Sequence, residues 1–392
     1  MRTHPQADAA SLEPFHHLVC SGEPEHTPCE PSAHSRELIR QDAARLRRLT
    51  GERAYARPLR GSTVVYRLEA GGHRQTGVVV EASVEDYRSG RIRRHEATHP
   101  DRESLLVHFL SAAQTELVPV ILVHPTRPRL QTLLAAAAAG EPDVRLGSDD
   151  GLSQTGWVVQ QSEELARAIW EEVDALGTVY IADGHHRMAA AERHARHRGP
   201  DTGNRAADYV LCALFPSGEA RVFGYHRCVP RNGLRAPDLL ATLARQPAIE
   251  RLQEYTPTQA PHPRPGVVAM WLQGRWYELR LRSNRDAADA HASLDIVGLE
   301  NGVLGAVLQV DDAGSDPRVI HVPGNIGAAA FADWCEEHDA IGFRVHPPTI
   351  EQIMAVSDAG GVMPPKSTWF DPKGRAGPFV RDISASADRG QC

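Results

Sequence analysis

Residues 178–187 read Thr-Val-Tyr-Ile-Ala-Asp-Gly-His-His-Arg, and residues 188–198 continue as an alanine-rich, charged run that stops before Gly199. This pattern predicts a strand, a tight glycine turn and a helix. The unpaired N–H groups and the dipole at the start of a helix attract an anion. Gly184 lets the backbone approach a ligand closely, and the guanidinium of Arg187 can form two parallel bonds to a phosphate. The stretch therefore predicts a phosphate-binding turn.

Three more side chains of this turn are candidates for chemistry. Asp183 either caps the helix or acts as a metal ligand or catalytic acid. His185 and His186 can each donate a hydrogen bond to a phosphate oxygen, whether protonated or neutral. Arg187 is the strongest candidate, because a guanidinium at a helix N-terminus is unfavourable unless an anion is bound. We therefore predict that Asp183 and His186 are catalytic and that His186 also binds phosphate with Gly184, His185 and Arg187.

A second polar cluster occupies residues 94–99, which read Arg-His-Glu-Ala-Thr-His. Glu96 is a candidate general base that takes a proton from an attacking hydroxyl. Residues 95–99 also spell the His-Glu-x-x-His zinc pattern, which requires both histidines on one face of a helix. Pro100 disfavours helical backbone at His99, so a zinc protease is the weaker interpretation. The neighbouring candidates for substrate contact are His95, Thr98 and Arg102.

The third motif is Met-Pro-Pro-Lys-Ser-Thr-Trp-Phe at residues 363–370. Two prolines fix the backbone before Lys366, Ser367 and Thr368, whose ammonium and hydroxyl groups can hold a phosphate or a metal ion. The glycine spacing of a Walker loop is absent, and an ordinary proline turn is the alternative interpretation. His226, at the end of another strand-like run, is a weaker candidate for substrate contact.

Composition excludes several classes of function. The chain of 392 residues has a formal net charge of −7, which argues against general binding to nucleic acid. No run approaches the roughly 18 apolar residues of a membrane-spanning helix. The N-terminus lacks the apolar centre of a signal peptide. We expect a cytoplasmic protein with reduced cysteines and a small-molecule substrate, without a nucleic-acid or membrane partner, and we leave its oligomeric state open.

Helical segments and hairpins alternate irregularly along the chain. For example, strand-like runs at 63–68 and 75–82 meet at Gly71-Gly72, which predicts a hairpin. This alternation predicts an α+β fold with mixed sheets. The expected parts are a diverged N-terminal arm (1–60), a core carrying the phosphate turn (61–231) and a C-terminal α+β region ending in the third motif (232–392).

The three motifs together resemble the family known as domain of unknown function 1015. The matching residues are 94–98, 180–187 and 363–370, and the resemblance extends over roughly residues 61–392. The chain departs from the family pattern at residues 99–102, where His-Pro-Asp-Arg stands in place of Gly-Pro-Lys. A lysine of the pattern is therefore missing after Glu96.

That family in turn resembles the ParB/sulfiredoxin superfamily, through a Gly-x-x-Arg turn that is residues 184–187 here. The resemblance implies a ParB/sulfiredoxin-like phosphate-binding core. It also implies phosphoryl transfer from ATP, ADP or pyrophosphate to the hydroxyl of serine or a similar amino acid, with Mg²⁺ as the expected cofactor. His185, His186 and Arg187 would then hold the donor phosphates, while Glu96 and Asp183 would be acid, base or metal groups. The alternative is a nucleotide-binding regulator without kinase turnover.

Overall fold

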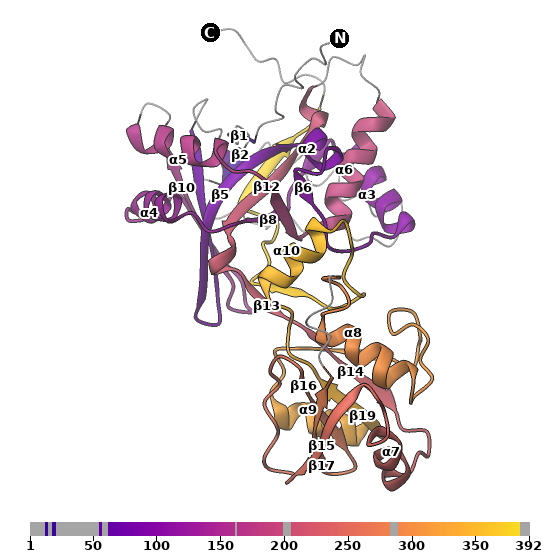
Figure 1. Cartoon of the computed structure of the whole chain (residues 1–392). Coiled ribbons are helices and arrows are strands. Elements are labelled where there is room, and N and C mark those ends of the chain that lie inside the picture. The colour runs from indigo at the N-terminus through magenta and orange to yellow at the C-terminus, as the bar shows by residue number, and fades with distance from the viewer. Residues whose placement is uncertain are drawn as a thin grey trace, which may run out of the picture. The chain divides into compact units, whose positions relative to one another are not determined.

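The protein is described by a computed structural model that divides into two compact units (Figure 1). Unit 1 comprises Met1–Arg94, Thr98–Arg221 and Pro372–Cys392, and unit 2 comprises His95–Ala97 and Val222–Asp371. The expected region 232–392 is thus shared between the units, because the chain returns to unit 1 at Pro372. Most of the expected arm 1–60 lies outside the described residues, which are 12–14, 18–20, 55–56, 62–160, 163–198, 205–282 and 289–384.

Unit 1 is built on a mixed sheet. Its strands are β1 (Glu13–Pro14), β4 (Thr63–Ala70), β5 (His73–Ser83), β6 (Ile92–Arg93), β8 (Val120–His124), β9 (Val144–Gly147), β10 (Ser153–Val159), β11 (Val179–Asp183) and β12 (Tyr209–Pro216). Their order is β6-β11-β8-β12-β5-β4-β10-β9, with β1 paired to β5. The pairs β11–β6 and β12–β8 are parallel. The predicted hairpin is confirmed as β4 and β5, and Gly71 and Gly72 turn between them with φ of 55° and 74°.

Helices cover one face of this sheet. They are α2 (Val84–Arg88), α3 (Pro100–Ala113), α4 (Pro128–Ala137), α5 (Glu164–Asp174) and α6 (His185–Arg198), with short 3₁₀ turns at Arg205–Asp208 and Ser217–Glu219. Side chains alternate across a strand, so Val78 and Val80 of β5 share this face. They belong to one buried apolar cluster with Ile169 of α5 and Met188 of α6. The strand and helix predicted around residues 178–198 are therefore confirmed as β11 and α6.

The C-terminal segment packs on the opposite face of the sheet. Its strand β21 (Phe379–Asp382) pairs with β2 (Leu18–Cys20) and β7 (Thr115–Glu116), and β2 also pairs with β3 (Tyr55–Ala56). The ring of Phe379 meets Tyr66 edge-on at 4.9 Å between centroids. Arg381 is fully buried and donates to the carboxylates of Glu81 at 2.8 Å and Glu116 at 3.0 Å. The end of the described chain is thus part of the core of unit 1.

Unit 2 has an antiparallel sheet in the order β15-β17-β16-β19-β14-β18. Phe331 and Cys335, on the helix of residues 328–337, pack against Cys228 and Trp276 of this sheet. Strands β13 and β20 form a separate pair. The elements are β13 (Arg221–Phe223), β14 (Tyr225–Pro230), α7 (Ala236–Leu243), β15 (Ile249–Tyr255), β16 (Val267–Leu272), β17 (Arg275–Leu281), α8 (Asp295–Leu299), the π-helical turn Glu300–Gly305, β18 (Ile320–Pro323), α9 (Ala328–Glu337), β19 (Ala340–Arg344), α10 (Ile350–Asp358) and β20 (Trp369–Asp371).

Helices and mixed or antiparallel sheets occur in both units, which confirms the predicted α+β class. Among the helices that the structure describes, none combines the length and the apolar character needed to cross a membrane.

Candidate functional site

The predicted phosphate turn joins β11 to α6. Gly184 has φ of 97°, and its carbonyl accepts the first helical hydrogen bond from Met188 N–H at 3.0 Å. A Cβ atom at Gly184 would lie 2.9 Å from Nη2 of Arg187 and 3.0 Å from its Nε. The positive φ therefore favours glycine here, and a Cβ atom would in addition displace the end of the Arg187 side chain.

Asp183 lies between two cationic side chains. Its Oδ2 accepts from Arg187 Nη2 at 2.9 Å, and its Oδ1 accepts from Lys373 Nζ at 2.6 Å. Burial raises the pKa of the Asp183 carboxyl, but the charges of Arg187 and Lys373 outweigh it and leave a pKa of about 2. The carboxylate is therefore ionised at neutral pH with both oxygens engaged. This favours a role in orienting the two cations over a role as general acid or base.

Arg187 keeps part of its hydrogen-bonding capacity. Its Nη2 also donates to the Pro119 carbonyl at 3.3 Å, whereas its buried Nε has no hydrogen-bond partner among the described residues. The side chain is 28% exposed, although it is paired with Asp183. The guanidinium is thus held in place but remains accessible to an anion.

His186 is fixed as a neutral donor. Its Nε2 accepts the backbone N–H of His99 at 3.1 Å, so its proton resides on Nδ1. The His99 and His186 rings are stacked, with centroids 6.0 Å apart. Burial lowers the pKa of His186, and the charges of Arg102 and His99 lower it further. This geometry suits donation from Nδ1 to a phosphate oxygen. The adjacent His185 is 3% exposed.

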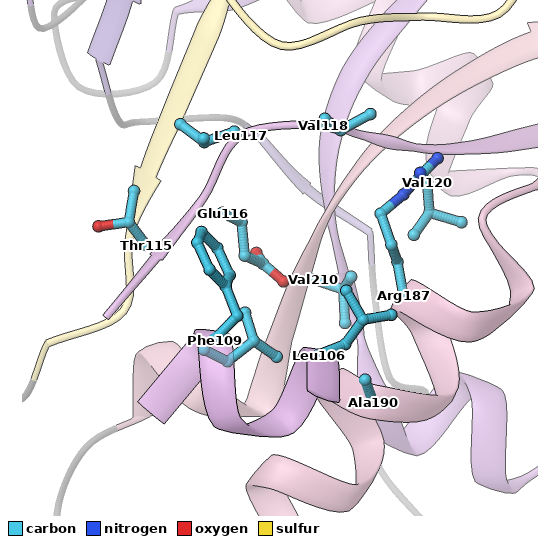
Figure 2. A pocket seen from close by; sticks show the side chains of 11 residues that line it. Leu106, Phe109, Thr115, Glu116, Leu117, Val118, Val120, Arg187, Ala190 and Val210 are labelled. Atoms are coloured by element: carbon cyan, nitrogen blue, oxygen red, sulfur yellow. The ribbon is translucent and has the colours of Figure 1, made fainter. Parts of the chain in front are cut away.

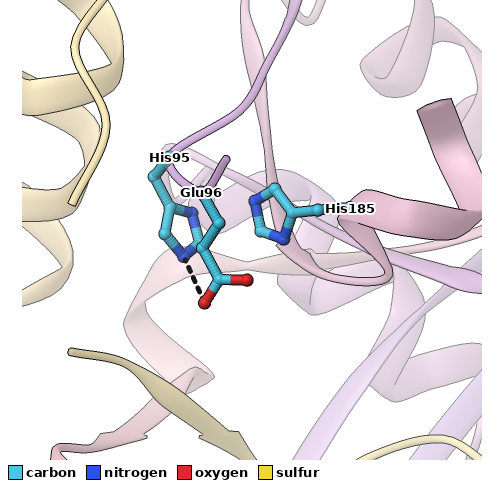
Figure 3. Close-up of side chains that lie close together, drawn as sticks. All are labelled: His95, Glu96 and His185. Carbon is cyan, nitrogen blue, oxygen red and sulfur yellow. Dashed lines mark ion pairs between the residues drawn. The ribbon is translucent and has the colours of Figure 1, made fainter. Parts of the chain in front are cut away.

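Glu96 belongs to a hydrogen-bonded group in unit 2. Thr368 Oγ1 donates to Glu96 Oε1 at 3.1 Å and accepts from Nε2 of the buried His95, also at 3.1 Å. The His95 Nε2 and Glu96 Oε1 atoms are 3.9 Å apart (Figure 3). The Glu96 side chain remains 38% exposed. Thr368 thus orients a carboxylate that is still accessible to a substrate.

The helical geometry required by the His-Glu-x-x-His zinc pattern is absent. Residues 94–98 form no helix, and His99 is the extended N-cap of α3, with φ of −96° and Pro100 at the first helical position. The two histidines therefore do not share a helix face, and the zinc-protease interpretation is wrong.

A buried arginine in unit 2 holds the loop that carries the third motif. Arg227 donates to the carbonyls of Tyr225 (2.9 Å), Lys366 (2.9 Å) and Pro365 (3.0 Å). It also makes two bonds to Glu300 Oε1, at 2.9 and 3.2 Å. Because an arginine has five N–H donors, every donor of Arg227 is used. The clamp supports the left-handed backbone of Lys366, whose φ is 55°.

The three polar groups of the motif have different surroundings. The Lys366 side chain is exposed, and its Nζ lies 5.4 Å from the ring centroid of Tyr225. Ser367 is 3% exposed and donates to the Pro364 carbonyl at 2.7 Å, so its hydroxyl stabilises the turn. Thr368 is also buried and contacts Glu96. Lys366 is therefore the member of this group with the exposure that a phosphate ligand needs.

The remaining candidates lie in different settings. Thr98 Oγ1 donates to Glu103 Oε1 at 2.5 Å, and Arg102 is exposed on the first turn of α3. His226 is 3% exposed, accepts from Val345 N–H and packs edge-on against Phe331. Burial, followed by the charges of Arg344 and Arg227, lowers the pKa of His226 to about 3. These contacts favour a packing role for His226 over substrate contact.

Sequence reasoning missed the partners that hold the site together. Lys373 comes three residues after the third motif, which is the only local signal for it. Arg227 and Glu300 are separated by 73 residues, and neither lies in a recognised motif. Ion pairs between distant residues need the fold before they can be found.

Comparison with known proteins identifies the family. Residues 15–297, more than half of the chain, match the family described as "Protein of unknown function (DUF1015)". The protein therefore belongs to this family, as its motifs predicted. The matched range contains the 94–98 and 180–187 motifs. No curated protein matches the sequence.

Several solved structures are weakly similar. A free serine kinase in complex with AMP is 12% identical, with a TM-score of 0.36 over 77% of this chain and 91% of that chain. SbnI with a C-terminal truncation, from Staphylococcus aureus, is 13% identical, with a TM-score of 0.40 over 80% and 90%. A conserved hypothetical protein from Pyrococcus furiosus is 12% identical, with a TM-score of 0.35 over 79% and 95%. Similarities of this size carry no argument about function.

Proposed function

We propose that this protein is a small-molecule kinase that transfers a phosphoryl group from a nucleotide or pyrophosphate to the hydroxyl of serine or a similar amino acid. In this proposal unit 1 is a ParB/sulfiredoxin-like core that binds the donor. The observation that supports this proposal is that Arg187 and Lys373 both donate hydrogen bonds to the Asp183 carboxylate at the start of α6. Two cations beside a glycine turn and a helix N-terminus suit the phosphates of a donor.

The reaction assigns a role to each group. The acceptor oxygen attacks the terminal phosphorus of the donor, and the bond from that phosphorus to the leaving-group oxygen breaks with its electron pair. Glu96 of unit 2, which Thr368 orients, is the candidate base for the acceptor proton. Arg187, Lys373 and the Nδ1–H of His186 stabilise the charge on the transferring group. Such stabilisation supplies most of the catalysis in phosphoryl transfer.

Lys366 is proposed as a further phosphate ligand, because it is exposed on a loop that the buried Arg227 fixes. Mg²⁺ fits the turn less well. Arg187 and Lys373 both donate to the Asp183 carboxylate, and their two positive charges disfavour a third cation at this position. We therefore assign no step to Mg²⁺. Comparing the rate of phosphoryl transfer with and without EDTA tests whether the donor must be bound as its Mg²⁺ complex.

The direct test is a screen of ATP, ADP, CTP and pyrophosphate against serine, threonine and homoserine, with the phosphorylated product detected by mass spectrometry. We expect product from at least one pair, and its loss in Glu96→Gln. Nucleotide binding without any phosphorylated product would instead favour the alternative function, a nucleotide-binding regulator without kinase turnover. Absence of both binding and product would overturn both functions.

A further inference from the structure

A cavity in unit 1 borders the phosphate turn. It offers about 50 Å³ to water-sized groups and lies among α3, α6 and the strands β7, β8 and β12. Figure 2 shows Leu106 and Phe109 of α3 facing Leu117 and Val118 across the cavity, with Arg187 at one side. All of its lining residues belong to the same unit.

The wall away from Arg187 is chemically apolar. Glu116 lines the cavity, but its Oε2 accepts from Leu211 N–H at 2.9 Å and from Arg381 at 3.0 Å. The Thr115 hydroxyl donates to the Ala113 carbonyl at 3.0 Å. A nucleobase placed here would bury nitrogen and oxygen atoms against a mostly hydrocarbon wall, which is costly. A hydrocarbon group makes no hydrogen bonds to water that it would lose on entering, so the cavity suits a hydrocarbon group.

Arg187 gives the cavity a charged edge. Its Nε has no hydrogen-bond partner among the residues described. Its Nη2 donates to the Asp183 carboxylate and to the Pro119 carbonyl. A ligand that fits this arrangement has a hydrocarbon group next to an anionic centre. During phosphoryl transfer the acceptor alcohol has that form, because its hydroxyl contacts the phosphoryl group that Arg187 holds.

We propose that this cavity binds the hydrocarbon side group of the acceptor, so that the preferred acceptor is a hydroxy amino acid larger and more apolar than serine. The inference rests on the proposed function, since it takes Arg187 as the phosphate ligand. Each methylene group buried in the cavity should strengthen binding about fourfold. Serine has no hydrocarbon to place there and should be a poor ligand.

The test measures the affinity of the full-length protein for serine, threonine, 3-hydroxyvaline and 3-hydroxyleucine by calorimetry. We expect affinity to rise along the series, with 3-hydroxyleucine binding at least tenfold more tightly than serine. Affinity that is flat or falls along the series overturns the proposal. Because calorimetry needs no turnover, the result is independent of whether phosphoryl transfer is detected.

A matched pair of variants locates the binding. Ala190 and Ala191 are neighbours on α6 and both are buried, but Ala190 lines the cavity and Ala191 does not. Ala190→Val should abolish the preference for 3-hydroxyleucine while leaving pyrophosphate affinity unchanged, whereas Ala191→Val should retain the preference. Should Ala190→Val fail to fold, Val118→Phe at the less buried edge replaces it. An unchanged preference in a folded cavity variant overturns the proposal.

The two proposals fail separately. If 3-hydroxyleucine binds and Ala190→Val loses it, but no donor yields a phosphorylated product, the cavity assignment stands and the kinase does not. If serine is phosphorylated and larger acceptors bind no better, the kinase stands and the cavity assignment falls.

Discussion

Gly184 combines a positive φ of 97° with contact to Arg187, and these two constraints can be separated. Gly184→Ala should cost about 1–3 kcal/mol of stability from backbone strain and should also displace the guanidinium. Gly90 is the matched control, because its φ is 80° and a Cβ there would meet nothing within 4 Å. Both variants should unfold at a lower urea concentration than the wild type does. Only Gly184→Ala should weaken pyrophosphate binding, by at least tenfold. Equal pyrophosphate affinities would place the phosphate site elsewhere.

Among the proposed phosphate ligands, Arg187 is the one whose loss should affect turnover most. Arg187→Ala should lower the turnover number of the proposed reaction roughly 10²–10³-fold, as does the loss of one preorganised donor in other enzymes. Arg193 lies on the same helix and serves as the control, because its Nη1 is 3.8 Å from Oε2 of Glu103. Steady-state kinetics of both variants should show a large effect for Arg187→Ala and less than a twofold effect for Arg193→Ala. Comparable effects would indicate a general influence of helix charge.

Asp183 makes stability depend on pH in the acid range. Its pKa is about 2 in the folded protein and 3.8 in the reference state. A lowered pKa stabilises the fold above pH 3.8, by about 2 kcal/mol here, and this contribution is lost as the pH falls from 3.8 to 2. Urea unfolding of the wild type and Asp183→Asn between pH 2 and 6 measures it. The stability difference between the two proteins should shrink below pH 4, and a constant difference would show that Asp183 is not paired as described.

Among the secondary-structure elements, those with a local signal were predictable. The hairpin of β4 and β5 follows from the strand-like runs on either side of Gly71-Gly72, and α6 follows from the run after Gly184. Helix α2, by contrast, has only five residues, Val84–Arg88, capped by the Ser83 side chain, and so short a helix leaves no clear period in the sequence. The short strand β9 is specified by its pairing with β10, which no local pattern reveals.

In the candidate site, too, features with a local sequence signal were predictable and contacts between distant residues were not. The turn at Gly184 and the position of Arg187 in the first turn of α6 were predictable, because the signals for a glycine turn and a helix start are local. The second cation on Asp183 was not, since Lys373 lies 190 residues away. The contact of Ser367 was not predictable either, because its hydroxyl donates to the Pro364 carbonyl of its own turn and only the folded loop reveals this.

The loop of residues 363–370 depends on the Arg227 clamp. Arg227→Met removes five hydrogen bonds and leaves Glu300 without its cation, which should cost about 3–5 kcal/mol. Arg275→Met is the control, because Arg275 and Glu254 are both at least half exposed and such pairs contribute about 1 kcal/mol or less. Urea unfolding measures the stabilities, and hydrogen exchange should show faster exchange at Ser367 and Thr368 in Arg227→Met alone. Unchanged exchange in that variant would mean that the loop is held by other contacts.

For the whole molecule, the described segment 372–384 is a structural part of unit 1 and also supplies Lys373 to the phosphate turn. The same segment places the fully buried Arg381 between Glu81 and Glu116. A single segment thus connects the stability of the core to the proposed chemistry. Loss of the Lys373 ammonium should therefore affect a site whose motif lies in the middle of the sequence.

Arg381→Met removes the cation that faces both buried carboxylates. Because a buried charge that loses its partner is strongly destabilising, we expect a loss of about 3–5 kcal/mol. Arg375→Met is the control from the same segment, since Arg375 and its partner Asp150 are both about half exposed, and it should cost about 1 kcal/mol or less. Urea unfolding followed by tryptophan fluorescence compares the two variants. Pyrophosphate binding should weaken in Arg381→Met only at urea concentrations where unit 1 unfolds, since the Arg381 guanidinium donates to Glu81, Glu116 and the Ala206 carbonyl. Similar stability losses in both variants would show that the chain end does not form the buried ion group described here.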